Sequence, residues 1–236
     1  QLANPGVGIG VAENSTTLYR PVDRLRTTLA YVYMMTMGTP EEQAMISRMV
    51  NHAHKPVKEA GRYNAFDPEL QLWVAATLVE NGIDLYQRVF GPLDEASKQR
   101  IYEDGQIFGT ALQVQQTQWP ETYAGFKDYW EEELEKVAPD ALVQAFAKQL
   151  LDGSNLPLQM RVLMPLQSLM TRGLIDPRAR EALDLPWGRR DQILFDLFWK
   201  VFPPVYRVVP RPIRTLGARL VVRDTRKRFK KHQRVI

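Results

Sequence analysis

Apolar residues recur every three or four positions along most of this chain, which is the period of an amphipathic helix. Three segments carry clear start and stop signals. Pro21 opens the first, and Gly38 ends it. Thr39-Pro40-Glu41-Glu42 begins the second with an N-cap, a first-turn proline and a capping box. Asp67-Pro68 begins the third, whose apolar positions indicate a buried central helix. We predict helices over residues 21–37, 40–58 and 68–89.

Proline and glycine divide the rest of the chain into further segments of helical period. The sequence has no convincing alternating strand and no internal repeat. We therefore predict an all-α fold, a single multi-helix globular domain of about nine to ten helices. We place this domain over residues 1–203 and a basic amphipathic C-terminal extension over 204–236. The further predicted helices are 94–115, 120–137, 139–151, 157–173, 177–184, 189–202 and 212–233.

Residues 1–15 are small and mostly apolar, with glycines at 6, 8 and 10. These glycines do not follow a strand and do not have the G-x-G-x-x-G spacing, so they do not indicate a nucleotide-binding loop. We expect either close helix packing or a turn that faces a cofactor.

The composition is that of a globular protein, with 44% hydrophobic and 25% charged residues. The most apolar run, residues 193–209, is interrupted by Asp196, Lys200 and Pro203-Pro204. It could lie on a membrane, but we do not expect it to cross one. The chain has no cysteine, which excludes disulfides, thiolate metal sites and cysteine nucleophiles. The first residues do not resemble a signal peptide. The expected location is the cytoplasm, with peripheral attachment to the inner face of a membrane as an option.

The net charge of +4 is unevenly distributed along the chain. Residues 204–236 carry eleven Arg or Lys and one acid, which gives +10 and leaves −6 for the rest. From Pro212 onward, basic residues could cover one face of a helix opposite Ile213, Leu216, Leu220 and Val221. Two readings stay open: a solvated basic helix, or attachment of residues 212–236 to anionic lipid. No motif for specific recognition of nucleic acid accompanies the charge.

Two of the three histidines, His52 and His54, lie at the end of the second predicted helix. His54 shares an apolar face with Ile46, Val50 and Val57, and His52 points elsewhere. Such a histidine is either a satisfied core residue or a metal ligand. A protein-only zinc site lacks enough ligands, and no Gly-x-Ser-x-Gly motif anchors a catalytic triad. A haem needs only one protein ligand and an apolar pocket.

Several motifs resemble the family of latex clearing protein (rubber oxygenase) and the MpaB-type oxygenases. Their order and spacing carry the resemblance, which extends over about residues 1–185. The motifs are the stretch Gln1–Ser15, Arg24-x-x-x-Thr28, Gly38-Thr39, His54-x-x-Val57, Tyr63-x-Ala65-x-Asp67-Pro68, Trp73-Val-x-Ala-Thr77-Leu78, Gly91-Pro92-Leu93 and Phe126-x-x-Tyr129-Trp130.

The resemblance implies a buried haem b pocket in which the residue matching His54 is the proximal iron ligand. Arg24 would meet a propionate or a distal acid, Thr28 would line the pocket, and Glu13 is a candidate distal acid or base. The implied activity is cleavage of a carbon–carbon double bond in an apolar substrate with dioxygen.

The chain departs from the family pattern at three positions. Thr27 stands where the rubber-cleaving branch has lysine, and Asn4 and Ala75 stand where many relatives have histidine. We therefore expect a smaller isoprenoid or lipid-like substrate rather than rubber. The alternative function is that of a non-catalytic helical protein that binds membranes through its basic C-terminal helix. The sequence does not indicate an oligomeric state.

Overall fold

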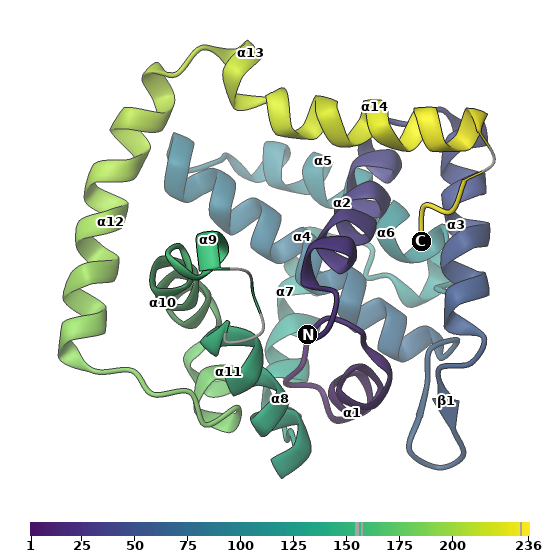
Figure 1. Ribbon diagram of the computed structural model, residues 1–236, viewed down its shortest axis with the longest axis horizontal. Helices are drawn as coiled ribbons and strands as arrows, with labels where there is room; N and C mark the ends of the chain where they lie inside the picture. Colours follow the sequence, from purple (N-terminus) through teal and green to yellow (C-terminus); the bar gives the residue numbers. More distant parts are fainter. Residues whose placement is uncertain (154–155, 157, 232) are drawn as a thin grey trace.

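The computed structural model describes residues 1–153, 156, 158–231 and 233–236 of the chain. It confirms the all-α class (Figure 1). Apart from one two-stranded hairpin, its regular elements are helices: α1 Pro5–Asn14, α2 Pro21–Met37, α3 Pro40–His54, α4 Pro68–Phe90, α5 Glu95–Gly105, α6 Ile107–Thr110, α7 Tyr123–Glu135, α8 Ala141–Asp152, α9 Leu158–Arg161, α10 Met164–Leu174, α11 Pro177–Ala182, α12 Arg189–Val208, α13 Arg211–Arg214, α14 Leu216–Lys230 and a 3-10 turn at Gln116–Gln118.

Helix α4 is the buried central element that the sequence predicts. Asp67 caps its first turn by accepting a hydrogen bond from the amide of Glu69 at 2.8 Å. The helix ends at Gly91, whose φ of +96° favours glycine. Its apolar side packs against α5, α6 and α12 and against α1. The buried residues on this side include Leu72, Ala76, Val79 and Ile83.

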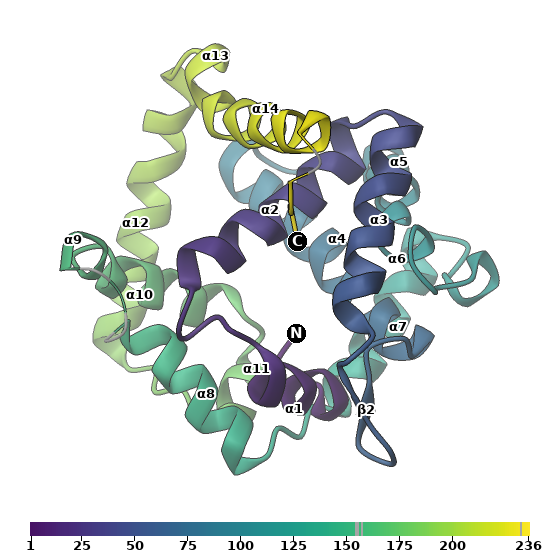
Figure 2. The same ribbon diagram turned by 45° about the vertical axis from the view of Figure 1, so that its right-hand side comes forward.

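Helices α2, α3 and α14 form a second packed group (Figure 2). The predicted capping box begins α3: Thr39 Oγ1 accepts from the amide of Glu42 at 3.3 Å, and Glu42 Oε2 accepts from the amide of Thr39 at 2.9 Å. Met34 and Ile46 are buried between these helices together with Val222 of α14. Helix α14 is therefore part of the folded body, because it covers α2.

The glycine-containing N-terminal stretch forms helix α1, which packs on α8. A Cβ atom at Gly8 would overlap the carbonyl oxygen of Leu2 and would lie 2.9 Å from a methyl group of Val143. This confirms the expected close helix packing, because only glycine allows this approach.

Three predicted helices are divided in the structure, so it contains more and shorter helices than we predicted. The helix expected over 94–115 ends at Gly105, where a Cβ would lie 2.6 Å from Val79, and resumes only as the short α6. The helix expected over 157–173 is divided into α9 and α10, because Pro165 lies in the first turn of α10 and cannot continue an earlier helix. Pro157, its predicted first residue, lies outside the described residues.

Two other predicted helix ends are wrong, and the third divided helix lies near the C-terminus. Helix α3 stops at His54 rather than Lys58, because Pro56 has no amide hydrogen to donate to the helix. Helix α12 continues past Pro203-Pro204 to Val208, since aromatic side chains on both sides of these prolines hold it against α4. The segment predicted over 212–233 forms two helices, α13 and α14. The boundary between the expected domain and extension, at residue 203, stays a prediction.

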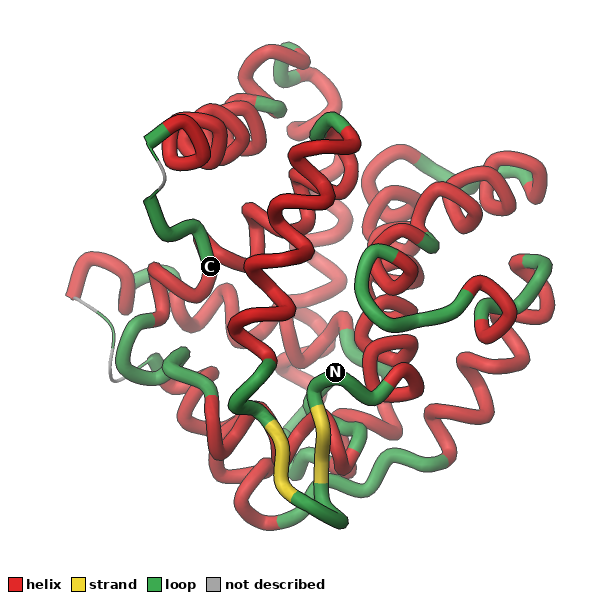
Figure 3. The backbone as a smooth tube through the Cα atoms, turned by 90° about the vertical axis from the view of Figure 1, so that its right-hand side faces the viewer, coloured by secondary structure: helices red, strands yellow, loops and turns green. Residues whose placement is uncertain are grey.

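A short hairpin, which the sequence did not predict, connects α3 to α4 (Figure 3). Its strands are β1, Lys58–Glu59, and β2, Tyr63–Asn64, paired antiparallel. Among the described residues, no helix is both long enough and apolar enough to span a bilayer.

Candidate functional site

His54 is the last residue of α3 and is half-buried. Its Nδ1 atom is buried and has no hydrogen-bond partner in the part of the chain that the structure describes. Buried polar atoms in folded proteins are nearly always hydrogen-bonded, and leaving one without a partner costs free energy. This unpaired atom disagrees with the first of the two alternatives for His54, a core histidine whose polar atoms are all hydrogen-bonded.

Phe66 covers one side of His54. The two rings lie at an interplanar angle of 82° with their centroids 6.4 Å apart. Phe66 is held by the hairpin, because the amide of Ala65 donates to the carbonyl of Val57 at 2.9 Å and the amide of Phe66 donates to Asn64 Oδ1 at 3.0 Å. Our sequence reasoning missed this residue. The available signal was its position inside the Tyr63-x-Ala65-x-Asp67-Pro68 motif.

Arg24 of α2 acts on His54 electrostatically. Burial away from water lowers the pKa of His54 below its usual 6.5, and the positive charge of Arg24 lowers it further. Both effects favour the neutral imidazole, which is the form that binds a metal. Arg24 is exposed, and none of the described carboxylates forms an ion pair with it. Its guanidinium is thus available to an anionic group near His54.

Thr28 lies one helical turn beyond Arg24. Its hydroxyl donates to the carbonyl oxygen of Arg24 at 2.9 Å, and the hydroxyl of the buried Thr27 donates to the same oxygen at 2.9 Å. Arg24 and Thr28 therefore share one face of α2, as their spacing predicts. Of the two hydroxyls, that of Thr28 lies on an exposed residue.

Glu13 has its own set of partners. It forms an ion pair with Arg62 at 2.8 Å and accepts a hydrogen bond from the Tyr63 hydroxyl at 2.9 Å. Tyr63, and then Arg62, lower the pKa of the Glu13 carboxyl. The lowered pKa suits a base better than an acid at neutral pH. The contacts described for Glu13 join it to the hairpin and not to His54, and its role as a distal acid or base stays a prediction.

No group of three or more metal-binding side chains occurs in the parts of the chain that the structure describes. His52 is exposed and lines a hollow of about 980 Å³ between α3 and the C-terminal residues Arg234–Ile236. His54 lines neither this hollow nor one of about 670 Å³ beside α14, so the buried haem pocket stays a prediction. His232 lies outside the described residues.

The residues around His54 fit a cofactor that needs one protein ligand. Burial and Arg24 lower the pKa of the imidazole, its Nδ1 has no hydrogen-bond partner among the described residues, the nearby arginine has no carboxylate partner there, and Phe66 adds an apolar surface. A haem requires one axial nitrogen, cations near its carboxylates and apolar surroundings. His54 offers the nitrogen and Arg24 the cation, and Phe66 supplies part of the apolar surroundings.

Comparison with known proteins agrees with the resemblance. Residues 1–203 match the family model described as ER-bound oxygenase mpaB/B'/Rubber oxygenase, catalytic domain. The chain is 34% identical over 245 residues to Uncharacterized protein Rv2237 of Mycobacterium tuberculosis, a match that covers 100% of this chain and 96% of the relative. Uncharacterized protein Mb2261 of Mycobacterium bovis matches with the same identity and coverage. No solved structure matches the chain significantly. The chain therefore belongs to the family of mpaB and rubber oxygenase catalytic domains.

Proposed function

We propose that this protein is a haem b-dependent oxygenase that uses dioxygen on an apolar, isoprenoid or lipid-like substrate. One observation carries the proposal: the partly buried His54 ring has a buried Nδ1 with no hydrogen-bond partner among the described residues. Burial and the charge of Arg24 also lower the pKa of this ring. Membership of an oxygenase family supports the reaction class.

Three residues have roles in this proposal. His54 would bind the iron through an imidazole nitrogen. Arg24 would pair with a haem propionate, because its guanidinium has no ion-pair partner among the described carboxylates. Thr28 would line the pocket, with its hydroxyl turned back to the carbonyl of Arg24. When bound, the haem supplies the activation of dioxygen.

The rest of the chain's contribution is to position the imidazole and keep water away from it. The capping box fixes the start of α3, and the hairpin bonds fix Phe66 against the ring at its end. Restricting water near an apolar substrate limits side reactions and strengthens local electrostatic interactions. Thr27, which stands in place of a lysine of the rubber-cleaving branch, argues for a substrate other than rubber.

The test is turnover by the reduced, haem-loaded protein. We would incubate it with a panel of isoprenoid and lipid alkenes and dioxygen, and measure oxygen consumption and carbonyl products. We expect carbonyl products from at least one alkene and none from His54→Ala. A haem-loaded protein that yields no product across the panel would contradict the oxygenase proposal and favour the non-catalytic alternative.

A further inference from the structure

Helix α12 carries an apolar face that no other part of the described chain covers. Its members recur at a spacing of three or four residues and therefore share one side of the helix. Leu197, Val201 and Val205 in the middle of this side are 54%, 53% and 58% exposed. We call the set the outer stripe: Ile193, Leu194, Leu197, Val201, Val205 and Val208, all exposed.

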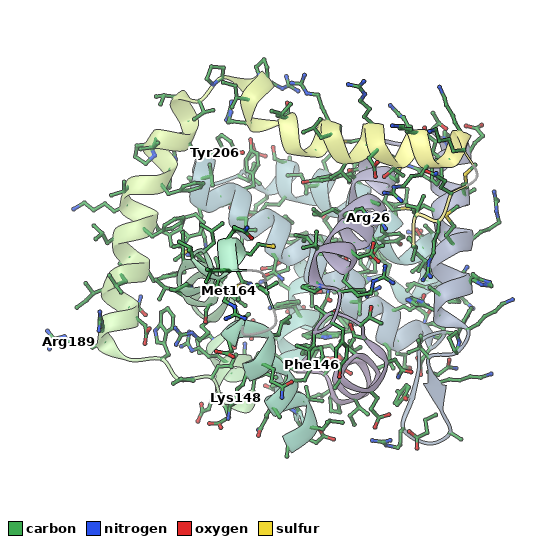
Figure 4. All side chains as sticks on the ribbon, in the orientation of Figure 1. Arg26, Phe146, Lys148, Met164, Arg189 and Tyr206 are labelled. Carbon is green, nitrogen blue, oxygen red and sulfur yellow. The ribbon has the colours of Figure 1, made fainter. Side chains whose placement is uncertain are left out.

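The opposite side of α12 already supplies the packing that holds the helix in place. Phe195 is buried there, and the guanidinium of Arg88 from α4 lies 5.8 Å from its ring centre and 5.5 Å from that of Trp199. Tyr206 contacts Phe90, with ring centroids 6.2 Å apart. In Figure 4, α12 forms one edge of the molecule and Arg189 at its start points away from the body. The outer stripe consequently faces outward.

Exposed apolar residues also occur after α12, in α13 and at the start of α14. Ile213, Leu216 and Leu220 are all more than half exposed. The structure revises our expectation for this segment, because α14 uses Val222 and Thr225 against α2 and keeps only its first apolar residues exposed. Most of the uncovered apolar surface in this region thus belongs to α12.

Basic residues are concentrated further along the chain, on α14. A hollow of about 670 Å³ between α14 and Met37 is lined by Arg219, Arg223, Lys227, Lys230 and other basic residues. Arg226 and Arg228 have carboxylate partners, Glu42 and Asp224. In the described part of the chain, by contrast, Arg223, Lys227 and Lys230 form no ion pair with any carboxylate.

We propose that the outer stripe and the cations of α14 together bind the surface of an anionic lipid bilayer. Apolar side chains would enter the boundary between headgroups and acyl chains, and the unpaired cations would contact lipid phosphates. A symmetric dimer through this surface fits less well, because it would bring the same cations of two copies together. The proposal is independent of the haem and of oxygenase activity.

Flotation with vesicles tests this proposal with the full-length protein. The probes are vesicles of phosphatidylcholine alone and of phosphatidylcholine mixed with phosphatidylglycerol. Point substitutions are preferable to truncation, because removing α14 would expose α2. The test variants are Val201→Glu in the outer stripe and Lys227→Glu in α14. Their matched controls are Leu142→Glu on α8, which is 46% exposed, and Arg100→Glu on α5, which is also exposed.

We expect the parent and both controls to float with the anionic vesicles. Each test variant should reduce the vesicle-bound to free ratio by about tenfold or more, and Lys227→Glu should weaken the preference for anionic lipid. Circular dichroism would show that the variants keep the helical content of the parent. A parent that does not bind anionic vesicles, or test variants that bind like their controls, would overturn the proposal. So would light scattering that shows a dimer separated by Val201→Glu without any change in flotation.

Discussion

The rings of His54 and Phe66 meet nearly at a right angle, with their planes 82° apart and their centroids 6.4 Å apart. Helix α3 and the hairpin that follows it bring them together across eleven intervening residues. Phe66 therefore contributes to the burial that lowers the pKa of His54.

Replacing Phe66 by alanine should raise the pKa of His54 toward its usual value, because water would reach the imidazole and stabilise its charged form. Phe66→Leu should change this pKa less, because leucine keeps an apolar side chain over the ring. The measurement is a pH titration of the histidine ring signals by NMR, assigned with His54→Gln. A His54 signal that titrates at the same pH in Phe66→Ala as in the parent would show that Phe66 does not shield it.

The lowered pKa of His54 also predicts a pH dependence of stability. Between the folded-state pKa and the usual value of 6.5, the unfolded chain binds more protons than the folded chain. The free energy of unfolding of the haem-free protein should therefore fall as the pH is lowered through this window, by at most about 1.4 kcal/mol per pH unit from this group.

Chemical denaturation at several pH values between neutral and mildly acidic would measure this dependence. Because other groups titrate as well, the informative quantity is the difference between the parent and His54→Gln, whose stability should fall less steeply. Parallel pH profiles for the two proteins would contradict a lowered pKa at His54.

Much of the fold could be predicted because its signals are local. Thr39 with Glu42, and Asp67 with Pro68, are complete helix starts that need no tertiary information. The predicted helix ends were wrong where contacts between residues distant in the sequence determine where a helix ends. Helix α12 passes through Pro203-Pro204 because its aromatic residues pack on α4, and Gly105 ends α5 where that helix approaches Val79.

The residues of the candidate site also fall into two groups, those predicted from local sequence signals and those placed by contacts between distant segments. The helical period identified His54 as facing the core and placed Arg24 and Thr28 on one face of α2. Phe66 was missed because an irregular turn, not a period, brings it back over His54. The contacts of Glu13 with Arg62 and Tyr63 were missed for the same reason, since they depend on where the hairpin folds.

The packing of α1 provides a prediction that is independent of the site. Gly8→Ala should destabilise the protein by about 1–3 kcal/mol, because the new methyl group would overlap the Leu2 carbonyl and Val143. Gly82→Ala in α4 is the matched control. Its Cβ would meet nothing within 4 Å, and it should stabilise the helix by about 0.5–1 kcal/mol. Denaturant unfolding compares the two; equal effects of the same sign would show that α1 is not packed as described.

Arg24→Gln should weaken binding of haemin by about two- to fivefold, the range expected for loss of one exposed ion pair with a propionate. The matched control is Arg20→Gln, which removes an exposed arginine from the same region, one already paired with Asp23 at 3.4 Å. Titration with haemin, followed by absorbance, would give both dissociation constants. Equal constants for the parent and Arg24→Gln would remove Arg24 from the cofactor site.

The central claim, that His54 binds a haem iron, is tested most directly by the absorption spectrum of the purified protein after addition of haemin. The comparison needs two variants, His54→Ala and the neighbouring His52→Ala, which removes an exposed histidine from the same helix end. We predict a Soret band in the parent that persists in His52→Ala and is lost or shifted in His54→Ala. A parent that keeps no Soret band once free haemin has been removed by gel filtration, or a His54→Ala spectrum identical to that of the parent, would contradict the account.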